Sequence, residues 1–327
     1  MILPDAPFRV EFEVDSACNL NCTYCYAKPF NYFTPSFERL EFLFNKTKQE
    51  ANPFEVVLVG GEPFLRKDFI GILERASEIF GGVVGTSTNG TMFSILPEEK
   101  LEKLRVLTAG NIDLQVSLDS VNADINSKTR GATEKVIAGL DTLEKHAIRF
   151  GVGIVLTKEN ANDVMHTVSY LLDTYTMLKR INLEPLRPTF ILGKRYIDLK
   201  LDGNRTIGIY NGVKRLVAES GRQEVKIAGV VESSAEREEG RTLLDTYRFK
   251  QCFAGLLRAG VFTDGSVTPC LALRTESLGN LYKESWLEIW IKAKENFTKT
   301  NVNGGQCIVN VLRKEATKEV RLTVPNC

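Results

Sequence analysis

Short segments that alternate hydrophobic and polar residues recur along the chain, separated by segments with hydrophobic residues at helical spacing. The first pattern predicts β-strands and the second predicts amphipathic helices. The predicted strands cover residues 10–14, 55–59, 82–88, 113–118, 150–157 and 180–186. About six strand–helix units imply parallel strands joined by right-handed crossovers. The sequence therefore predicts an α/β fold, a partial (β/α)6 TIM-type barrel.

Polar side chains are expected on one face of several predicted strands. Polar and apolar residues alternate strictly over 10–15 and 113–119, and briefly over 181–184. Because alternate side chains point to opposite faces, the apolar set can pack on helices while the polar set lines the barrel interior. An ordinary closed barrel fills its interior with branched apolar side chains. We expect an interior that holds a polar ligand; the alternative is edge strands with one solvated face.

Composition and charge narrow the function classes. The 327 residues include 42 Lys and Arg against 41 Asp and Glu, with 43% hydrophobic residues, the balance of an ordinary soluble protein. A net charge of +1 argues against a protein that coats nucleic acid or binds a membrane surface. No secretory signal or membrane-spanning run is evident. We expect a cytoplasmic protein whose seven cysteines are thiolates or metal ligands rather than disulfides.

The chain is long enough for two domains. A highly charged stretch over 232–241 precedes a region with more glycine and turn signals and the last four cysteines. We therefore expect a barrel over residues 1–235 and a second, small α+β domain over 236–327.

Three cysteines lie close together directly after the first predicted strand. Cys18, Cys22 and Cys25 have the spacing i, i+4, i+7, so their thiolates can converge on one point. Three ligands leave a four-iron cluster with one open iron, whereas structural zinc needs a fourth protein ligand. A zinc site that borrows a distant cysteine is the alternative.

A second motif follows the next predicted strand. Gly60, Gly61, Glu62 and Pro63 come directly after the apolar run 56–59, at the barrel face that carries the cysteines. Glycine permits close approach of a ligand to the backbone.

These motifs resemble those of the radical S-adenosylmethionine (SAM) superfamily, including an aromatic residue, Tyr24, before the third cysteine. The resemblance implies that Cys18, Cys22 and Cys25 bind a [4Fe–4S] cluster whose open iron is chelated by SAM. It further implies that Tyr24 belongs to the SAM site. The GGEP motif at 60–63 corresponds to the family segment whose backbone and glutamate hold the SAM amino group.

Later segments match the same family in order. Thr88 and Asn89 end the third predicted strand as a TNG-type turn does in relatives. Ser117 and Asp119 resemble the S-x-D-G segment that follows the fourth strand, with a serine replacing its glycine. Ser117 and Arg130 match positions that contact the SAM carboxylate in similar enzymes. Arg130 could instead form a surface ion pair.

The C-terminal third resembles the twitch/SPASM extension of radical SAM enzymes. An Asp264–Gly265 turn predicts a β-hairpin, and Cys252 and Cys270 flank it. The cysteine run of a full SPASM domain is absent, so a twitch-like domain with one auxiliary [4Fe–4S] cluster fits better. The resemblance suggests four ligands: Cys252, Cys270, Cys307 and Cys327. Without Cys327 the auxiliary cluster would have an open iron.

The resemblance implies an enzyme that cleaves SAM reductively to a 5′-deoxyadenosyl radical, which removes a substrate hydrogen. The auxiliary cluster would accept or relay an electron, and a low-potential donor such as ferredoxin or flavodoxin would supply one. We expect maturation of a ribosomally made peptide or protein. The alternatives are tetrapyrrole or other cofactor biosynthesis and, in another class, a non-catalytic iron–sulfur carrier or zinc scaffold.

Overall fold

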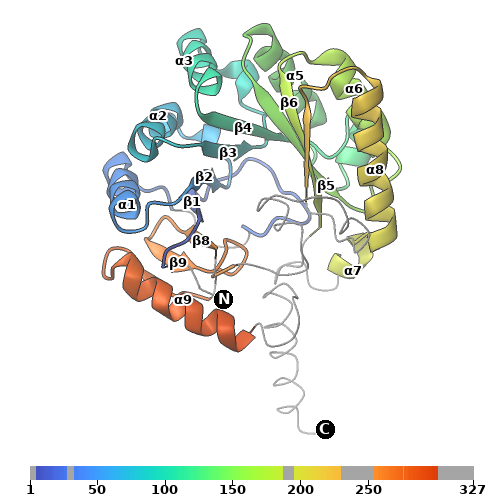
Figure 1. Cartoon of the computed structure of the whole chain (residues 1–327). Coiled ribbons are helices and arrows are strands. Elements are labelled where there is room, and N and C mark those ends of the chain that lie inside the picture. Colours follow the sequence, from blue (N-terminus) through green and yellow to red (C-terminus); the bar gives the residue numbers. More distant parts are fainter. Residues whose placement is uncertain are drawn as a thin grey trace, which may run out of the picture.

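The computed structural model describes residues 5–27, 33–186, 195–229, 254–255, 257–274 and 276–300. Strands form a curved sheet, and helices surround it in an outer arc (Figure 1). The helices are α1 (Phe37–Glu50), α2 (Phe69–Phe80), α3 (Glu98–Ala109), α4 (Ala123–Asn126), α5 (Thr133–Lys145), α6 (Val164–Thr174), α7 (Arg195–Leu199), α8 (Gly203–Glu219) and α9 (Trp286–Thr300). Two 3-10 turns are η1 (Pro63–Leu65) and η2 (Phe93–Ile95).

The sheet has the strand order β10-β9-β8-β1-β2-β3-β4-β5-β6-β7. Its strands are β1 (Arg9–Asp15), β2 (Glu55–Gly60), β3 (Val84–Thr88), β4 (Ile112–Ser117), β5 (Phe150–Leu156), β6 (Leu178–Pro185), β7 (Lys226–Gly229), β8 (Arg258–Val261), β9 (Ser266–Thr268) and β10 (Gly279–Asn280). Neighbouring strands from β8 through β1 to β7 are parallel, and β9 and β10 are antiparallel additions. Within the described residues the two edge strands do not pair with each other, so the barrel is partial.

All six predicted strands and the partial-barrel architecture are confirmed. The parallel strand β7 was not predicted, because four residues are too few to carry a recognisable alternation. Parallel β8, which adds to the free side of β1, was expected only as half of the C-terminal hairpin.

Apolar residues of β1 and the surrounding helices form the core. Val10, Phe12 and Val14 have no exposed surface. The ring of Phe12 packs edge-on against Phe44 of α1, with ring centroids 5.0 Å apart, and it also contacts Phe80 of α2. The outward face of β1 therefore fixes both helices, as the strand–helix pattern predicts.

The opposite face of β1 carries buried carboxylates that point toward the barrel interior. Glu11 and Glu13 are 7% and 2% exposed. Arg258 Nη2 donates to Glu11 Oε1 at 2.5 Å, and Arg274 forms an ion pair with Glu13. The expected polar interior is thus confirmed, because β1 has neighbours on both sides and is not an edge strand. Much of its charge is neutralised by arginines from the C-terminal region.

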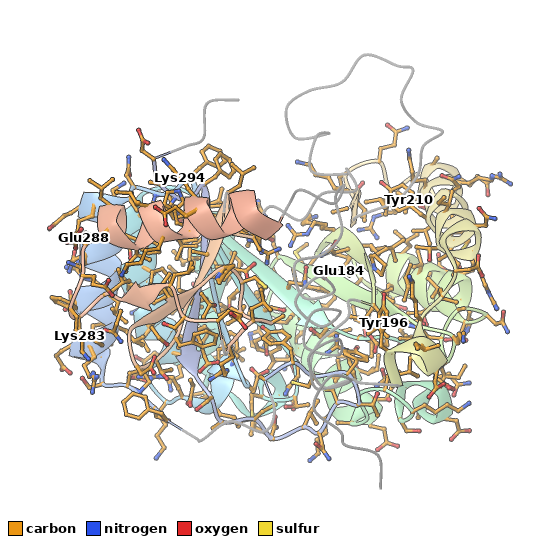
Figure 2. The ribbon with its side chains drawn as sticks, turned by 90° about the horizontal axis from the view of Figure 1, so that it is seen from below. Glu184, Tyr196, Tyr210, Lys283, Glu288 and Lys294 are labelled. Atoms are coloured by element: carbon orange, nitrogen blue, oxygen red, sulfur yellow. The ribbon has the colours of Figure 1, made fainter. Side chains whose placement is uncertain are left out.

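The C-terminal hairpin joins the barrel sheet through β8. Its turn contains Gly265 at φ +82°, a conformation that favours glycine. Helix α9 then packs on α1, where the indole nitrogen of buried Trp286 donates to Thr47 Oγ1 at 3.0 Å. Figure 2 shows α9, which carries Glu288 and Lys294, beside one end of the curved sheet and α8, which carries Tyr210, beside the other end. The expected domain boundary between residues 235 and 236 lies outside the described residues.

None of the helices in the described part of the chain combines the length and apolar composition needed to cross a lipid bilayer.

Candidate functional site

Residues 18–25, here called the Cys loop, follow the C-terminal end of β1 and carry three half-buried thiols: Cys18, Cys22 and Cys25. Burial raises the pKa of the Cys22 thiol, the nearby Arg130 guanidinium opposes this shift, and the other two thiols add to it. The three sulfurs therefore interact electrostatically with one another and with a fixed positive charge.

The donor set of the Cys loop suits an iron–sulfur cluster. Three thiols on one loop are the soft ligands that such clusters take, and they leave one iron of a four-iron cluster open. Among the described residues no three Cys, His, Asp or Glu side chains are gathered closely enough to hold a single metal ion. A structural zinc site would need a fourth ligand at this position.

The GGEP loop, residues 60–63, packs directly against the backbone that leads into the Cys loop. The amide of Gly61 donates to the carbonyl of Asp15 at 2.8 Å, and the amide of Glu62 donates to the carbonyl of Ala17 at 2.7 Å. A Cβ atom on Gly60 would lie 2.1 Å from the Asp15 oxygen, and one on Gly61 would lie equally close to the Ala17 oxygen. Only glycine therefore permits this approach.

The carboxylate of Glu62 connects the ends of β2 and β3. It has no exposed surface and accepts hydrogen bonds from Thr88 Oγ1 and the Asn89 amide, both at 2.6 Å, and from the Phe64 amide at 3.0 Å. Burial raises its pKa to about 7, although these three bonds act in the opposite direction. Glu62 thus organises the turn at Thr88–Asn89 within the protein.

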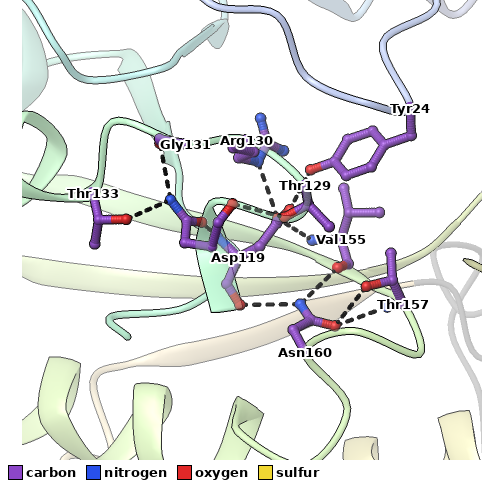
Figure 3. A network of polar contacts seen from close by, with 10 residues as sticks. Tyr24, Asp119, Thr129, Arg130, Gly131, Thr133, Val155, Thr157 and Asn160 are labelled. Carbon is purple, nitrogen blue, oxygen red and sulfur yellow. Dashed lines mark hydrogen bonds and ion pairs between the residues drawn. The ribbon is translucent and has the colours of Figure 1, made fainter. Parts of the chain in front are cut away.

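Asp119 is the centre of a second network, which lies beyond the end of β4 (Figure 3). Its buried carboxylate accepts hydrogen bonds from the Tyr24 phenol, from Arg130 Nε at 3.0 Å and from the Val155 amide at 3.0 Å. The Arg130 guanidinium also lies over the Tyr24 ring, 5.2 Å from its centroid. Only 14% of the Arg130 side chain is exposed, so its ion pair is internal rather than a surface contact.

Asn160 supports this network from the turn after β5. Its Nδ2 donates to the Asp119 carbonyl at 3.0 Å, and its Oδ1 accepts from the Thr157 amide at 2.8 Å. The polar end of β5 is thereby fixed to the end of β4.

The structure brings the ten predicted cofactor-binding residues to the C-terminal ends of β1 to β4 and the loops that follow. They are Tyr24, Gly60, Gly61, Glu62, Pro63, Thr88, Asn89, Ser117, Asp119 and Arg130. Pro63 begins η1, and Ser117 is the buried last residue of β4.

Sequence reasoning missed several polar residues around these loops. Asn19 and Thr91 form hydrogen bonds with Asn89. Arg66 Nη1 donates to the carbonyls of Val14 and Pro35, so it connects the end of β1 to the residues just before α1. The contacts of Asn19 and Arg66 join distant parts of the chain, and no local pattern in the sequence signals them.

Cys270 is the predicted auxiliary ligand that the structure describes. It is a half-buried thiol in the loop after β9. Burial raises the pKa of the Tyr26 phenol, and Glu11, Cys25 and Cys270 act on it in the same direction. Tyr26 therefore lies within electrostatic range of both cysteine sites. Cys252, Cys307 and Cys327 lie outside the described residues.

Two family models match the chain. The model of the radical SAM superfamily matches residues 13–171, and the SPASM model, an iron–sulfur cluster-binding domain, matches residues 252–318.

The chain is similar to proteins of both expected kinds, a heme synthase and a maturation protein. The AdoMet-dependent heme synthase of Methanosarcina barkeri is 30% identical over 50% of this chain and 47% of its own length. The sporulation killing factor maturation protein SkfB of Bacillus subtilis is 24% identical over 92% of this chain and 69% of its own. The chain thus spans about half the length of the heme synthase.

A likeness in fold extends over nearly the whole chain. The crystal structure of Streptococcus suis SuiB bound to S-adenosylmethionine has a TM-score of 0.73 and 16% identity, and covers 94% of this chain and 75% of SuiB. SuiB bound to its precursor peptide SuiA has a TM-score of 0.69 and 15% identity, over 88% of this chain and 65% of SuiB. The matched motifs, the partial barrel and both family models together establish that this chain belongs to the radical SAM superfamily and carries a C-terminal iron–sulfur domain of the SPASM type.

Proposed function

We propose that the protein cleaves SAM reductively and uses the resulting radical to remove a hydrogen atom from a peptide or protein during its maturation. One observation carries this proposal: at the C-terminal ends of β1 and β2, the GGEP loop is hydrogen-bonded to Asp15 and Ala17, the backbone that leads directly into the Cys loop. Both halves of a cluster-and-SAM site are therefore held in one rigid arrangement.

A cluster bound by Cys18, Cys22 and Cys25 would supply, with SAM on its open iron, the electron that breaks the SAM carbon–sulfur bond and generates a 5′-deoxyadenosyl radical. The residues of this chain orient and shield that reaction. The amides of Gly61 and Glu62 hold the GGEP loop against the backbone that leads into the Cys loop, and the carbonyl oxygens of this loop would be the acceptors for the SAM amino group. Arg130, fixed by Asp119, offers a guanidinium for the carboxylate of SAM.

A peptide substrate is favoured by the extent of similarity. The maturation protein SkfB aligns over 92% of this chain, whereas the heme synthase aligns over 50%. The greater identity of the heme synthase, 30%, favours tetrapyrrole or other cofactor biosynthesis as the second candidate. Assays with candidate precursor peptides and with tetrapyrroles separate the two, because hydrogen removal changes the mass of the substrate that is used.

An auxiliary [4Fe–4S] cluster is proposed as the acceptor or relay of an electron. Its suggested ligands are Cys252, Cys270, Cys307 and Cys327. The proposal includes a cytoplasmic location, where thiols stay reduced, and a low-potential donor such as ferredoxin or flavodoxin. The near-zero net charge speaks against nucleic acid or a membrane surface as a partner.

The test is anaerobic reconstitution with iron and sulfide, followed by SAM and dithionite. The wild type should release 5′-deoxyadenosine. A wild type that binds iron but forms no 5′-deoxyadenosine would be an electron carrier or scaffold instead. A Cys18/Cys22/Cys25→Ala triple variant should keep about four of roughly eight irons and release none of this product. Retention of all the iron, or of none, would contradict two separate clusters.

A further inference from the structure

A ring of polar side chains holds the amide of Asn89 against the sulfur of Cys18. Asn89 Nδ2 lies 4.0 Å from Cys18 Sγ and donates to Asn19 Oδ1 at 2.8 Å. Asn19 Nδ2 donates to Thr91 Oγ1 at 2.9 Å, and Thr91 Oγ1 donates to Asn89 Oδ1 at 2.7 Å. The ring closes on itself, so each member restrains the next.

The orientation of the Asn89 amide follows from its partners. The backbone amide of Thr91 donates to Asn89 Oδ1 at 3.0 Å, and a backbone amide can only donate. The atom that faces Thr91 is therefore the oxygen, and the nitrogen faces Cys18. One of its hydrogens serves Asn19, which leaves the other for the sulfur.

The backbone of Asn89 is fixed as firmly as its side chain. Its amide donates to buried Glu62 Oε2 at 2.6 Å. The next residue, Gly90, has φ +76°, and a Cβ there would lie 2.6 Å from Val116 Cγ1. Asn89 itself is 7% exposed. The turn therefore presents the Asn89 amide to the Cys loop in a single position.

We propose that Asn89 is a positioning residue that donates an N–H hydrogen bond to the sulfur of Cys18 and thereby raises the reduction potential of the cluster bound there. The inference rests on the proposed function, since it requires Cys18 to be a cluster ligand. A donor to a ligating sulfur withdraws electron density and stabilises the reduced, more negative cluster.

The three thiols of the Cys loop differ in the hydrogen-bond donors that reach their sulfurs. The Leu20 amide is a second donor to Cys18 Sγ, at 3.4 Å, but no side-chain substitution removes it. In the part of the chain that the structure describes, no side-chain amide donates to Cys22 or Cys25. Asn89 is therefore the position at which this interaction can be removed.

The test is an anaerobic redox titration of the reconstituted full chain, followed by electron paramagnetic resonance. The signal that changes on addition of SAM identifies the cluster of the Cys loop. Asn89→Ala should shift its midpoint potential to a more negative value at unchanged iron content. Asn89→Asp, which keeps the size and the acceptor for Thr91 but lacks the N–H donor, should shift it the same way.

Thr91→Val is the matched control, because it breaks the ring but keeps both the Asn89 amide and the Thr91 backbone donor. Its midpoint should equal that of the wild type. An unchanged midpoint in Asn89→Asp overturns the inference, and so does a shift in Thr91→Val as large as that in Asn89→Ala. If the alanine variant does not assemble the cluster, the aspartate variant decides. A wild type that assembles the cluster but releases no 5′-deoxyadenosine refutes the proposed function separately.

Discussion

The phenol of Tyr24 donates a hydrogen bond to the buried carboxylate of Asp119, 95 positions further along the chain. The amide of the preceding residue, Thr23, donates to the carbonyl of Thr129 at 2.8 Å. Together these bonds attach the Cys loop to the segment after β4, next to Arg130. The loop that is expected to bind the cluster is therefore held from two sides, by the GGEP loop and by the Asp119 network.

Asp119→Ala should destabilise the protein strongly. It leaves the largely buried Arg130 without its carboxylate, and loss of one partner of a buried ion pair costs about 3–5 kcal/mol. Tyr24→Phe should cost about 1.5–3 kcal/mol, because it removes a single hydrogen bond to a charged group. Urea unfolding of the cluster-free protein measures both.

The control is Tyr196→Phe. Within the described residues the phenol oxygen of Tyr196 has no hydrogen bond, so its removal should change the stability of the protein by less than about 0.5 kcal/mol. Equal effects of Tyr24→Phe and Tyr196→Phe would contradict a role of Asp119 as the anchor of the Cys loop.

The buried carboxyl group of Glu62 should make stability depend on pH. Its pKa of about 7 in the folded protein lies above the ordinary value of 4.5. Between about pH 4.5 and 7, the folded state therefore keeps a proton on Glu62 that the unfolded state loses. The stabilisation from this proton is complete below about pH 4.5 and is lost as the pH rises through 7. The loss amounts to about 3 kcal/mol.

Glu62→Gln removes this titration. The stability difference between wild type and variant should therefore change by about 3 kcal/mol between pH 4.5 and 7.5, in favour of the variant at the higher pH. Thr88→Val is the matched control, since it removes one bond to the carboxylate and keeps the titrating group. Parallel stability curves for wild type and Glu62→Gln would show that Glu62 stays ionised.

Gly61→Ala should prevent assembly of the cluster site. The new Cβ would meet the carbonyl of Ala17 at 2.1 Å, and backbone on both sides leaves little room for adjustment. We expect a lower melting temperature and a loss of the iron bound by the Cys loop after reconstitution. Iron analysis and absorption spectra measure the second effect.

Gly208→Ala provides the comparison. Gly208 lies within α8 with no atom within 4 Å of an added Cβ, so alanine there should be neutral or should stabilise by up to about 1 kcal/mol. Normal iron binding by Gly61→Ala would mean that the GGEP and Cys loops can separate without consequence.

Local patterns in the sequence were sufficient to predict the barrel and the positions of its functional loops. Parallel strands bring their C-terminal ends to one edge, so the motifs after β1 and β2 had to meet. Alternation in β1 also predicted that Glu11 and Glu13 face the interior. These predictions depend only on the spacing of residues along short segments of the sequence.

Long-range partners could not be predicted in the same way. Glu13 pairs with Arg274, 261 positions away, and nothing in the sequence distinguishes this arginine from the others. The same holds for the ring that joins Asn19 to Asn89. Carboxylates predicted to be buried must have partners, but the sequence does not identify them. They become clear only because the C-terminal hairpin packs beside β1 in the structure.

Trp286 should hold α9 against the barrel. Its side chain is 1% exposed, its backbone amide donates to Glu50 Oε2 at 2.8 Å, and its indole donates to Thr47 Oγ1. Trp286→Ala removes a large buried ring and should cost about 3–5 kcal/mol. Because the cost falls on the attachment of α9 to α1, limited proteolysis should cut within 286–300 before it cuts the barrel.

Thr47→Val tests the indole bond on its own. It keeps the packing but leaves a buried N–H without an acceptor, a cost of about 1–3 kcal/mol. Leu287→Ala, at a residue 57% exposed on the outer side of the same helix, should leave both stability and cleavage close to wild type. If Trp286→Ala and Leu287→Ala were cut at the same rate, the contact between Trp286 and α1 would not be what secures the helix.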